Sequence, residues 1–347
     1  MAVALALATA VVAAAVYLVV GTGPPGLEAR WRLRAGGAVV GAPEVQGGTL
    51  FVATRAGALV AVEAETGAAR WRFETGERVQ ASPVAQGGLV YVVTDAPESG
   101  GGRVFAVDAR TGTEQWRVAL DVPVTSRLSV DGGLVYVPAG DVVAVDALTG
   151  EERWRATVGT GTVALSAGSG VVVVTGPSGL GALDADTGGE RWRVAASGPS
   201  PVAPVVAGDS VVAGDGAGFL VGRDTVDGTE RWRVPDAGLA QPPLAEGQVL
   251  VLATPDGLMA LAGATGERRW RVGLGGGDDG DRVRVATDGT AVAATSGGRL
   301  TLFDGVTGEV LGAADLADEG RATPAVANGR VYVAEGEIIA AFDRPGA

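Results

Sequence analysis

Hydrophobic residues along this chain gather in short runs rich in Val, Leu and Tyr, with polar or glycine-rich segments between them. In one representative stretch the runs span residues 89–93, 102–108 and 115–118, and glycine-rich or Thr-Gly turns separate them. Short β-branched and aromatic runs bounded by turn residues are typical of β-strands. The pattern therefore predicts an all-β protein built from many short strands.

The strand pattern repeats along the sequence. A motif written A-x-D-x-x-T-G-x-x-x-W-R is clearest at residues 144–155 and returns over most of the chain. Its turn glycines, at intervals of 38 to 45 residues, are Gly67, Gly112, Gly150, Gly188, Gly228, Gly266 and Gly308. The tryptophans, all but the first of them four residues after one of these glycines, are Trp31, Trp71, Trp116, Trp154, Trp192, Trp232 and Trp270. A fixed period of about 40 residues indicates a repeat architecture with one supersecondary unit per repeat.

Each repeat is predicted to contain four strands. Prolines that keep the same period lie seven residues before an aliphatic residue of the next run, in what we predict to be the first strand of each repeat, and they are Pro43, Pro83, Pro204, Pro243 and Pro324. Because proline cannot donate a ladder hydrogen bond, it indicates an edge strand. Two central strands follow, and the outer strand carries the tryptophan. Four-stranded units repeated around an axis are the blades of a β-propeller.

The number of blades follows from one position in the third strand of each repeat. Its eight copies are Glu63, Asp108, Asp146, Asp184, Asp224, Ala262, Asp304 and Asp343. The eighth copy leaves no room for a tryptophan strand before the end of the sequence, whereas residues 28–33 form such a strand with no blade before it. We therefore expect the N-terminal strand to complete the last blade. The prediction is an eight-bladed, monomeric ring over residues 28–347.

The repeat resembles the tryptophan-docking motif of the quinoprotein-dehydrogenase-like propellers over residues 28–343. That group includes the PQQ-dependent alcohol dehydrogenases and the outer-membrane assembly lipoprotein BamB. The resemblance implies that each tryptophan is buried between neighbouring blades. It does not fix the function, because this fold hosts both enzymes and binding proteins. WD repeats fit less well, since the chain has no His and no Trp-Asp pair, and kelch repeats are longer.

The polar residues of the motif are predicted to be structural. The repeated aspartate precedes a Thr-Gly turn, where its carboxylate accepts backbone N–H bonds. Arginines flank most of the tryptophans, and we expect them to pair across blades with acidic residues such as Glu152, Glu190 and Glu230. The alternative is a basic girdle for an acidic partner.

Two irregular stretches interrupt the period. Residues 95–102 lengthen one hairpin, and residues 274–281 form an acidic, glycine-rich connection. Carboxylates of this kind suit a hard cation such as Ca²⁺, but their spacing does not match an EF-hand loop. We expect a solvated loop and no metal site.

Composition narrows the chemistry. The net charge of −13 disfavours binding to nucleic acid or to an anionic membrane surface. The chain has no Cys, and therefore no disulfide, thiol nucleophile or lipid-modified cysteine. It also has no His, the commonest general base. These absences favour a protein without catalytic residues or cofactors.

The N-terminus is uncharged and apolar. Residues 2–20 carry no charge, which suits a transmembrane helix that acts as a signal-anchor. A cleaved signal peptide and a start site placed too late, with cytoplasmic residues upstream, are the alternatives. Residues 21–27 are predicted to be a linker, followed directly by the propeller. The expected topology has the ring outside the cytoplasm.

Three functions are compatible with these features. The first is a non-catalytic, membrane-anchored scaffold or ligand-sensing domain that binds a protein or small ligand. The second is the sensor ectodomain of a receptor kinase whose cytoplasmic part lies upstream. The third is a PQQ-dependent dehydrogenase, which the family resemblance implies would need a vicinal disulfide, a Ca²⁺ site and a carboxylate base. Because the disulfide cannot form, we favour the first.

Overall fold

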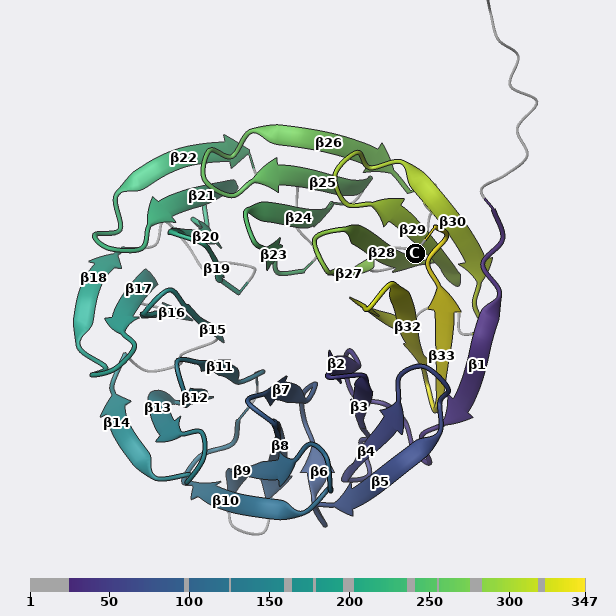
Figure 1. The fold of residues 1–347 in the computed structure, drawn as a ribbon. Coiled ribbons are helices and arrows are strands. Elements are labelled where there is room, and N and C mark those ends of the chain that lie inside the picture. Colours follow the sequence, from purple (N-terminus) through teal and green to yellow (C-terminus); the bar gives the residue numbers. More distant parts are fainter. Residues whose placement is uncertain are drawn as a thin grey trace, which may run out of the picture.

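The computed structural model describes residues 25–96, 100–124, 126–158, 164–176, 179–195, 203–235, 241–254, 256–274, 283–317 and 322–346. Their strands form eight antiparallel sheets arranged radially around a central axis (Figure 1). Each sheet is one blade, and its strands follow one another from the axis to the rim. The prediction of an eight-bladed propeller with four-stranded blades is confirmed.

The first four blades follow the chain in order. Blade 1 consists of β2 (Glu44–Gln46), β3 (Thr49–Ala53), β4 (Ala58–Glu63) and β5 (Ala69–Glu74). Blade 2 has a two-piece inner strand, β6 (Arg78–Val79) and β7 (Val84–Gln86), followed by β8 (Leu89–Ala96), β9 (Gly101–Asp108) and β10 (Glu114–Leu120). Blade 3 consists of β11 (Ser129–Asp131), β12 (Leu134–Ala139), β13 (Asp141–Asp146) and β14 (Glu152–Ala156). Blade 4 consists of β15 (Ala164–Gly168), β16 (Val171–Gly176), β17 (Gly179–Asp184) and β18 (Glu190–Val194).

The other four blades complete the ring. Blade 5 consists of β19 (Val205–Ala207), β20 (Ser210–Gly214), β21 (Phe219–Asp224) and β22 (Glu230–Pro235). Blade 6 consists of β23 (Leu244–Glu246), β24 (Val249–Thr254), β25 (Gly257–Ala262) and β26 (Arg268–Gly273). Blade 7 consists of β27 (Arg284–Thr287), β28 (Ala291–Ser296), β29 (Arg299–Asp304) and β30 (Val310–Asp315). Blade 8 consists of β31 (Thr323–Ala327), β32 (Arg330–Glu335), β33 (Ile338–Asp343) and the N-terminal β1 (Ala29–Arg34).

Blade 8 closes the ring by joining the two ends of the chain. β1 pairs antiparallel with β33, with Trp31 opposite Ala341 and Leu33 opposite Ile339. The N-terminal strand is therefore the outer strand of the last blade (Figure 1), as the position of the spare tryptophan strand predicts.

The hydrophobic core lies between the blades. Alternate residues of each middle strand face opposite neighbours, and both sides are covered, so these strands are apolar throughout. Val171, Val172 and Val173, for example, are all fully buried. Between blades 1 and 2, Phe51 and Leu59 pack with Phe105 and other buried residues. The core is thus a ring of separate interfaces, one between each pair of blades.

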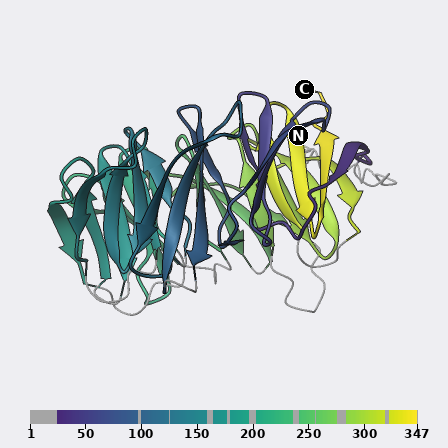
Figure 2. The same cartoon turned by 90° about the horizontal axis from the view of Figure 1, so that it is seen from below.

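The turns divide between two faces (Figure 2). Because successive strands run in opposite directions, the hairpins after the first and third strands share one face, which we call the hairpin face. The hairpins after the second strands and the links between blades lie on the other, which we call the connection face. In blade 2 the second hairpin is lengthened as predicted, since β8 and β9 have eight residues each.

Some predicted features lie outside the described residues. They include the N-terminal hydrophobic helix over residues 2–20 and most of the acidic loop over residues 274–281. Among the residues that the structure describes, no helix has the length and apolar character needed to cross a bilayer.

Candidate functional site

The repeated aspartate organises the turn between the third and fourth strands. In blade 3, Oδ1 of Asp146 accepts hydrogen bonds from the backbone N–H groups of Leu148 (2.9 Å) and Thr149 (3.0 Å). Oδ2 accepts a 2.7 Å hydrogen bond from the Arg153 guanidinium. The bond from Arg153 and the two backbone donors lower the pKa of Asp146 to about 2. The predicted structural role of this aspartate is confirmed.

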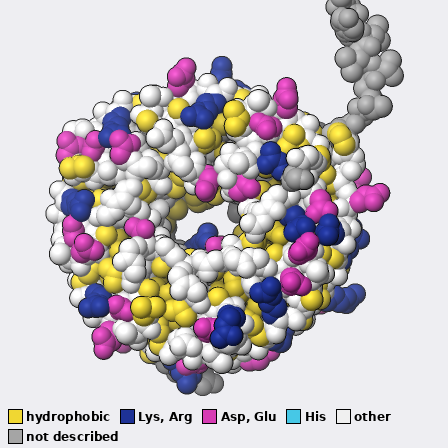
Figure 3. All heavy atoms as spheres, in the orientation of Figure 1, with side chains coloured by type: hydrophobic (Ala, Val, Ile, Leu, Met, Phe, Trp, Pro, Cys, Tyr) yellow, Lys and Arg dark blue, Asp and Glu magenta, His cyan; other side chains and the backbone are white. Residues whose placement is uncertain are grey.

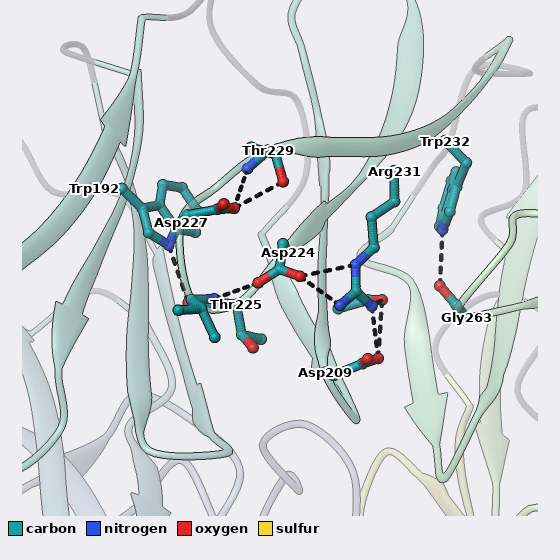
Figure 4. A network of polar contacts seen from close by, with 11 residues as sticks. Trp192, Asp209, Asp224, Thr225, Asp227, Thr229, Arg231, Trp232 and Gly263 are labelled. Atoms are coloured by element: carbon teal, nitrogen blue, oxygen red, sulfur yellow. Dashed lines mark hydrogen bonds and ion pairs between the residues drawn. The ribbon is translucent and has the colours of Figure 1, made fainter.

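Blade 5 shows the same network with one more carboxylate (Figure 4). The Arg231 guanidinium lies between Asp224, at 2.6 Å, and Asp209, at 2.8 Å. Asp224 also accepts a 2.7 Å bond from the backbone N–H of Val226. One arginine of the outer strand therefore joins two turns of its own blade on the hairpin face.

Each tryptophan of an outer strand reaches into the next blade. In blade 3, Nε1 of Trp154 donates a 2.9 Å hydrogen bond to the carbonyl oxygen of Ala185 in blade 4. All seven indoles make this bond, to the oxygens of Ala64, Ala109, Ala147, Ala185, Thr225, Gly263 and Gly305 in chain order. In each blade the acceptor is the residue that follows the repeated third-strand position.

The indole lies against the turn glycine of that next blade. Gly188 has a φ of 71°, and a Cβ placed on it would lie 2.5 Å from Cε3 of Trp154. The other six turn glycines also have φ near +70°, and a Cβ placed on each would lie 2.6 to 2.9 Å from the tryptophan ring of the preceding blade. Glycine is therefore required twice at this position, for the left-handed backbone and for the close approach of the ring.

Burial of the tryptophans is uneven. Trp116, Trp154, Trp192, Trp232 and Trp270 are buried, with 7 to 9% of their surface exposed. Trp31 and Trp71, which lie on either side of blade 1, are half-buried. These residues are contacts of the framework, and none of them lines the central channel described below.

Most of the flanking arginines pair within their own blade. Arg155 pairs with Glu152 at 2.8 Å, Arg193 with Glu190 and Arg233 with Glu230, each pair within one outer strand. The predicted acidic partners are correct, but the predicted cross-blade direction is wrong for these three pairs. Arg30 on the outer strand of blade 8 does reach the next blade, where Glu65 lies 3.8 Å away. The cause of the within-strand pairs is a β-bulge, in which Trp154 is opposite Ala144 while Glu152 is opposite Val145. The extra residue shifts the alternation, so Glu152 and Arg155 share a face although they are three apart.

The blade 7–8 interface has no tryptophan. Gly312 occupies the equivalent position, because it is opposite Leu302 in β29 as Trp154 is opposite Ala144 in β13. Leu27 fills the vacated space, and a Cβ on Gly312 would lie 2.7 Å from its Cδ2. Residues 25–27, which we call the strap, also exchange two backbone hydrogen bonds with Ala313, of 2.7 and 2.9 Å. The residue pattern predicts these residues as part of a linker, and a glycine at the tryptophan position is the signal that points to the strap.

The axis of the ring is a channel lined by the inner strands (Figure 3). A cavity of about 340 Å³ lies along one side of it, between β2, β23, β27 and β31. Its wall combines polar groups with apolar side chains such as those of Pro43, Leu244 and Val285. Inner strands supply this wall because their edges and alternate side chains have no further blade to pack against.

Few charged groups enter the channel. Arg127, from the link between blades 2 and 3, reaches Glu44 in blade 1 at 3.0 Å. Burial raises the pKa of Glu44, although Arg127 and a backbone N–H bond from Ala85 act in the opposite direction. Glu246 adds a second carboxylate to the lining. Within the described ranges, no three potential metal ligands are grouped together. The cavity is thus a mixed polar and apolar surface crossed by one ion pair, which suits binding better than acid–base chemistry.

Solved structures share this fold at low sequence identity. BamB from Moraxella catarrhalis aligns over 92% of this chain and 98% of its own, with a TM-score of 0.67 and 20% identity. The computationally designed Ika8 protein aligns over 92% and 100%, with a TM-score of 0.72 and 17% identity. Quinohemoprotein alcohol dehydrogenase from Comamonas testosteroni aligns over 91% and 76%, with a TM-score of 0.62 and 15% identity. These similarities establish the propeller fold.

Sequence comparison identifies the family. No curated protein sequence matches the chain. A family model described as outer membrane protein assembly factor BamB matches residues 18–160, 138–283 and 255–346. The matched segments together cover nearly the whole sequence, and the chain therefore belongs to the BamB family of β-propellers.

Proposed function

We propose that this protein is a non-catalytic scaffold, held at the outer face of a membrane by its N-terminal segment, whose ring binds partner proteins. The observation that carries the proposal is that the repeated polar residues hold the ring together. The aspartates and arginines of the motif bond to one another and to turns, as Asp146 with Arg153 and Asp224 with Arg231 do. The polar groups that recur in most blades therefore build the ring, and the surfaces left between them are available for binding.

Two further observations support the scaffold. The matched family is described as an assembly factor, and a related propeller fold is found in BamB of Moraxella catarrhalis. The uncharged residues 2–20 are long enough for one membrane span. A membrane-held ring would concentrate partners at the surface without chemistry of its own.

Quinoprotein dehydrogenases are the other relatives in fold, and the channel does not fit their cofactor. PQQ is a flat polyanion, which requires convergent cations. Among the described residues that line the channel cavity, Arg127 is the one cation, and it is already paired with Glu44. Glu246 adds further negative charge. We therefore expect no saturable heat or absorbance change when PQQ and Ca²⁺ are titrated into the protein.

Topology is tested by cysteine labelling, because the natural chain has no Cys. Leu148 is 73% exposed on the hairpin face, so a Leu148→Cys variant offers an accessible thiol. In intact cells stripped of any outer barrier, a membrane-impermeant maleimide is expected to label it. An Ala2→Cys variant serves as the control and is expected to react only after lysis. Labelling of Leu148→Cys only after lysis would reject the proposed topology.

A further inference from the structure

A cleft opens on the rim where the N-terminal segment leaves blade 7 and crosses to blade 8. It lies between β30 and β1, has a volume of about 400 Å³, and we call it the rim cleft. Figure 1 shows these two strands as neighbours on the rim of the ring. Its lining includes Ala29, Trp31 and Arg32 on one side and Ala314 and Asp315 on the other. Phe342, which is buried, also contributes to it. The cleft is distinct from the central channel, which lies at the axis.

One wall of the rim cleft is a strand edge that accepts an extended chain. The strap already pairs with this edge through Ala313, and the pairing there is parallel. Backbone groups that point outward recur at every second residue of an edge strand, so Asp315 also directs its N–H and C=O outward. Among the described residues, no pairing on this edge is recorded beyond the Gly26–Ala313 bridge. Within the part of the chain that the structure describes, the edge beside Asp315 is therefore open.

This edge carries less charge than the other outer strands, since Asp315 is its one charged residue. β30 has the sequence VLGAAD, without arginine, whereas each of the other seven outer strands contains at least one. Charged side chains and prolines on edge strands prevent unwanted pairing. In blade 5 the equivalent of Asp315 is Pro235, since Phe219 is opposite Pro235 as Arg299 is opposite Asp315. Blade 7 thus leaves open a position that blade 5 blocks.

The other wall carries an arginine without a carboxylate partner. Arg32 directly follows Trp31, and in the six other tryptophan strands the equivalent arginine pairs with an acidic residue. In blade 1, for instance, Arg72 pairs with Glu74 at 2.6 Å. Arg32 is exposed and has no ion pair among the described residues. Glu28 lines the same cleft but forms no ion pair with Arg32, so the Arg32 guanidinium is available to a ligand at the mouth of the rim cleft.

We propose that the rim cleft binds an extended segment of a partner protein, which pairs with the β30 edge at Asp315 and places a carboxylate against Arg32. The apolar side chains of Ala29, Ala314 and Phe342 would receive an aliphatic side chain of the same segment. Addition of a strand to an exposed edge is a common mode of peptide recognition, in which backbone bonds provide affinity and side-chain pockets provide specificity. The proposal rests on the scaffold function and assigns it a surface.

The test uses peptides of about 10 residues, the length of a long strand. A phage-displayed random library is selected on the full chain, and the peptides enriched are measured by fluorescence anisotropy. Loss of one backbone or charged hydrogen bond typically weakens binding about tenfold. We expect that loss for Asp315→Pro and for Arg32→Ala, and we expect the enriched peptides to contain Asp or Glu. The matched controls, Glu74→Pro and Arg72→Ala at the same positions of blade 1, should bind normally.

The outcomes separate this proposal from the scaffold function. Peptides that keep full affinity for both rim-cleft variants, or a selection that enriches none, would overturn the proposal. A cellular partner captured equally by wild type and both variants would also reject the rim cleft while leaving the scaffold function intact. Circular dichroism melts of all four variants identify any that fail to fold, and Arg32→Lys, which keeps the charge, should recover part of the affinity.

Discussion

The seven interfaces closed by a tryptophan and the single interface between blades 7 and 8 achieve the same closure by different means. At the first kind, an indole from one blade contacts a glycine turn of the next and donates a hydrogen bond to its backbone. Trp154, for example, packs against Gly188 and donates to the carbonyl oxygen of Ala185. At the second, Leu27 fills the space above Gly312 and the strap adds two backbone bonds. A repeat motif depends on a turn between the third and fourth strands of the following blade, and in blade 8 the fourth strand is β1, which comes from the other end of the described chain.

The difference indicates where a ring built from repeats is vulnerable. Leu27 is partly buried and lacks a hydrogen-bonding side chain, whereas an indole contributes both area and a donor. We therefore predict that the blade 7–8 interface is the weaker contact.

The largest effect is expected from removal of the closing strand. Deletion of residues 27–36 takes away β1, leaves β33 without its outer neighbour and removes Trp31 from the turn at Gly67. Because both adjacent interfaces lose contacts, the whole domain should lose stability rather than fray at one end. Thermal melting by circular dichroism measures this, and a truncated protein that melts like the full chain would reject the closure.

A tryptophan substitution is expected to be the next most severe. Trp154→Ala removes a buried indole and its bond to Ala185, and such substitutions cost roughly 3–5 kcal/mol. Urea denaturation gives the free energy of unfolding. Leu148→Ala, at an exposed residue of the same blade, is the control and should change it by less than about 0.5 kcal/mol.

Substitution of a turn glycine separates the two demands on that position. In Gly188→Ala the new Cβ is strained by a φ of 71° and also clashes with the Trp154 ring. In Gly208→Ala the φ is 63°, but no atom outside the neighbouring residues lies within 4 Å of the new Cβ. The backbone strain alone costs about 1 kcal/mol, which both variants share. Gly188→Ala should lose at least as much again from displacement of the indole. Equal losses in the two variants would show that the indole contact adds nothing.

The strap offers a smaller and more local effect. Leu27→Ala removes a partly buried side chain and is expected to cost about 1–2 kcal/mol, less than the loss at Trp154. Gly312→Ala should act in the same direction, since its Cβ would displace Leu27. Hydrogen exchange measured by mass spectrometry should show faster exchange in β30 and β33 and unchanged exchange in blades 3 and 4. Equal loss of protection from exchange around the whole ring would argue against an effect confined to the blade 7–8 interface.

Sequence spacing predicts the repeated parts of this molecule and misses its exceptions. The positions of tryptophan and aspartate define the blades, their register and the closure by β1, because each recurs at a fixed distance from a turn. The spacing does not show that Trp154 contacts the glycine of the following blade, since the motif places a glycine four residues before it as well. The within-strand pairs such as Arg155–Glu152 depend on a bulge, which strict alternation conceals. The strap and the rim cleft were not predictable from a period, because each occurs once.

The smallest effect expected is a loss of stability in acid at the tryptophan-closed interfaces. Asp146 and Asp184, which form the turns that receive Trp116 and Trp154, have pKa values lowered to about 2, first of all by hydrogen bonds from Arg153 and Arg191. A carboxylate whose pKa is lower in the folded state stabilises that state above the unfolded pKa and loses the contribution as pH falls through the folded value. The stability should therefore decline between about pH 4 and about pH 2, and only modestly, because these side chains remain partly exposed to solvent and salt. Melting temperatures recorded across this range measure the decline.

Asp146→Asn should be less stable than wild type at neutral pH and show a shallower decline in acid. As the pH falls, hydrogen exchange should become faster in the turns at Gly150 and Gly188 before it does so in the strap, which contains no titratable group. The opposite order would show that acid acts first at the blade 7–8 interface.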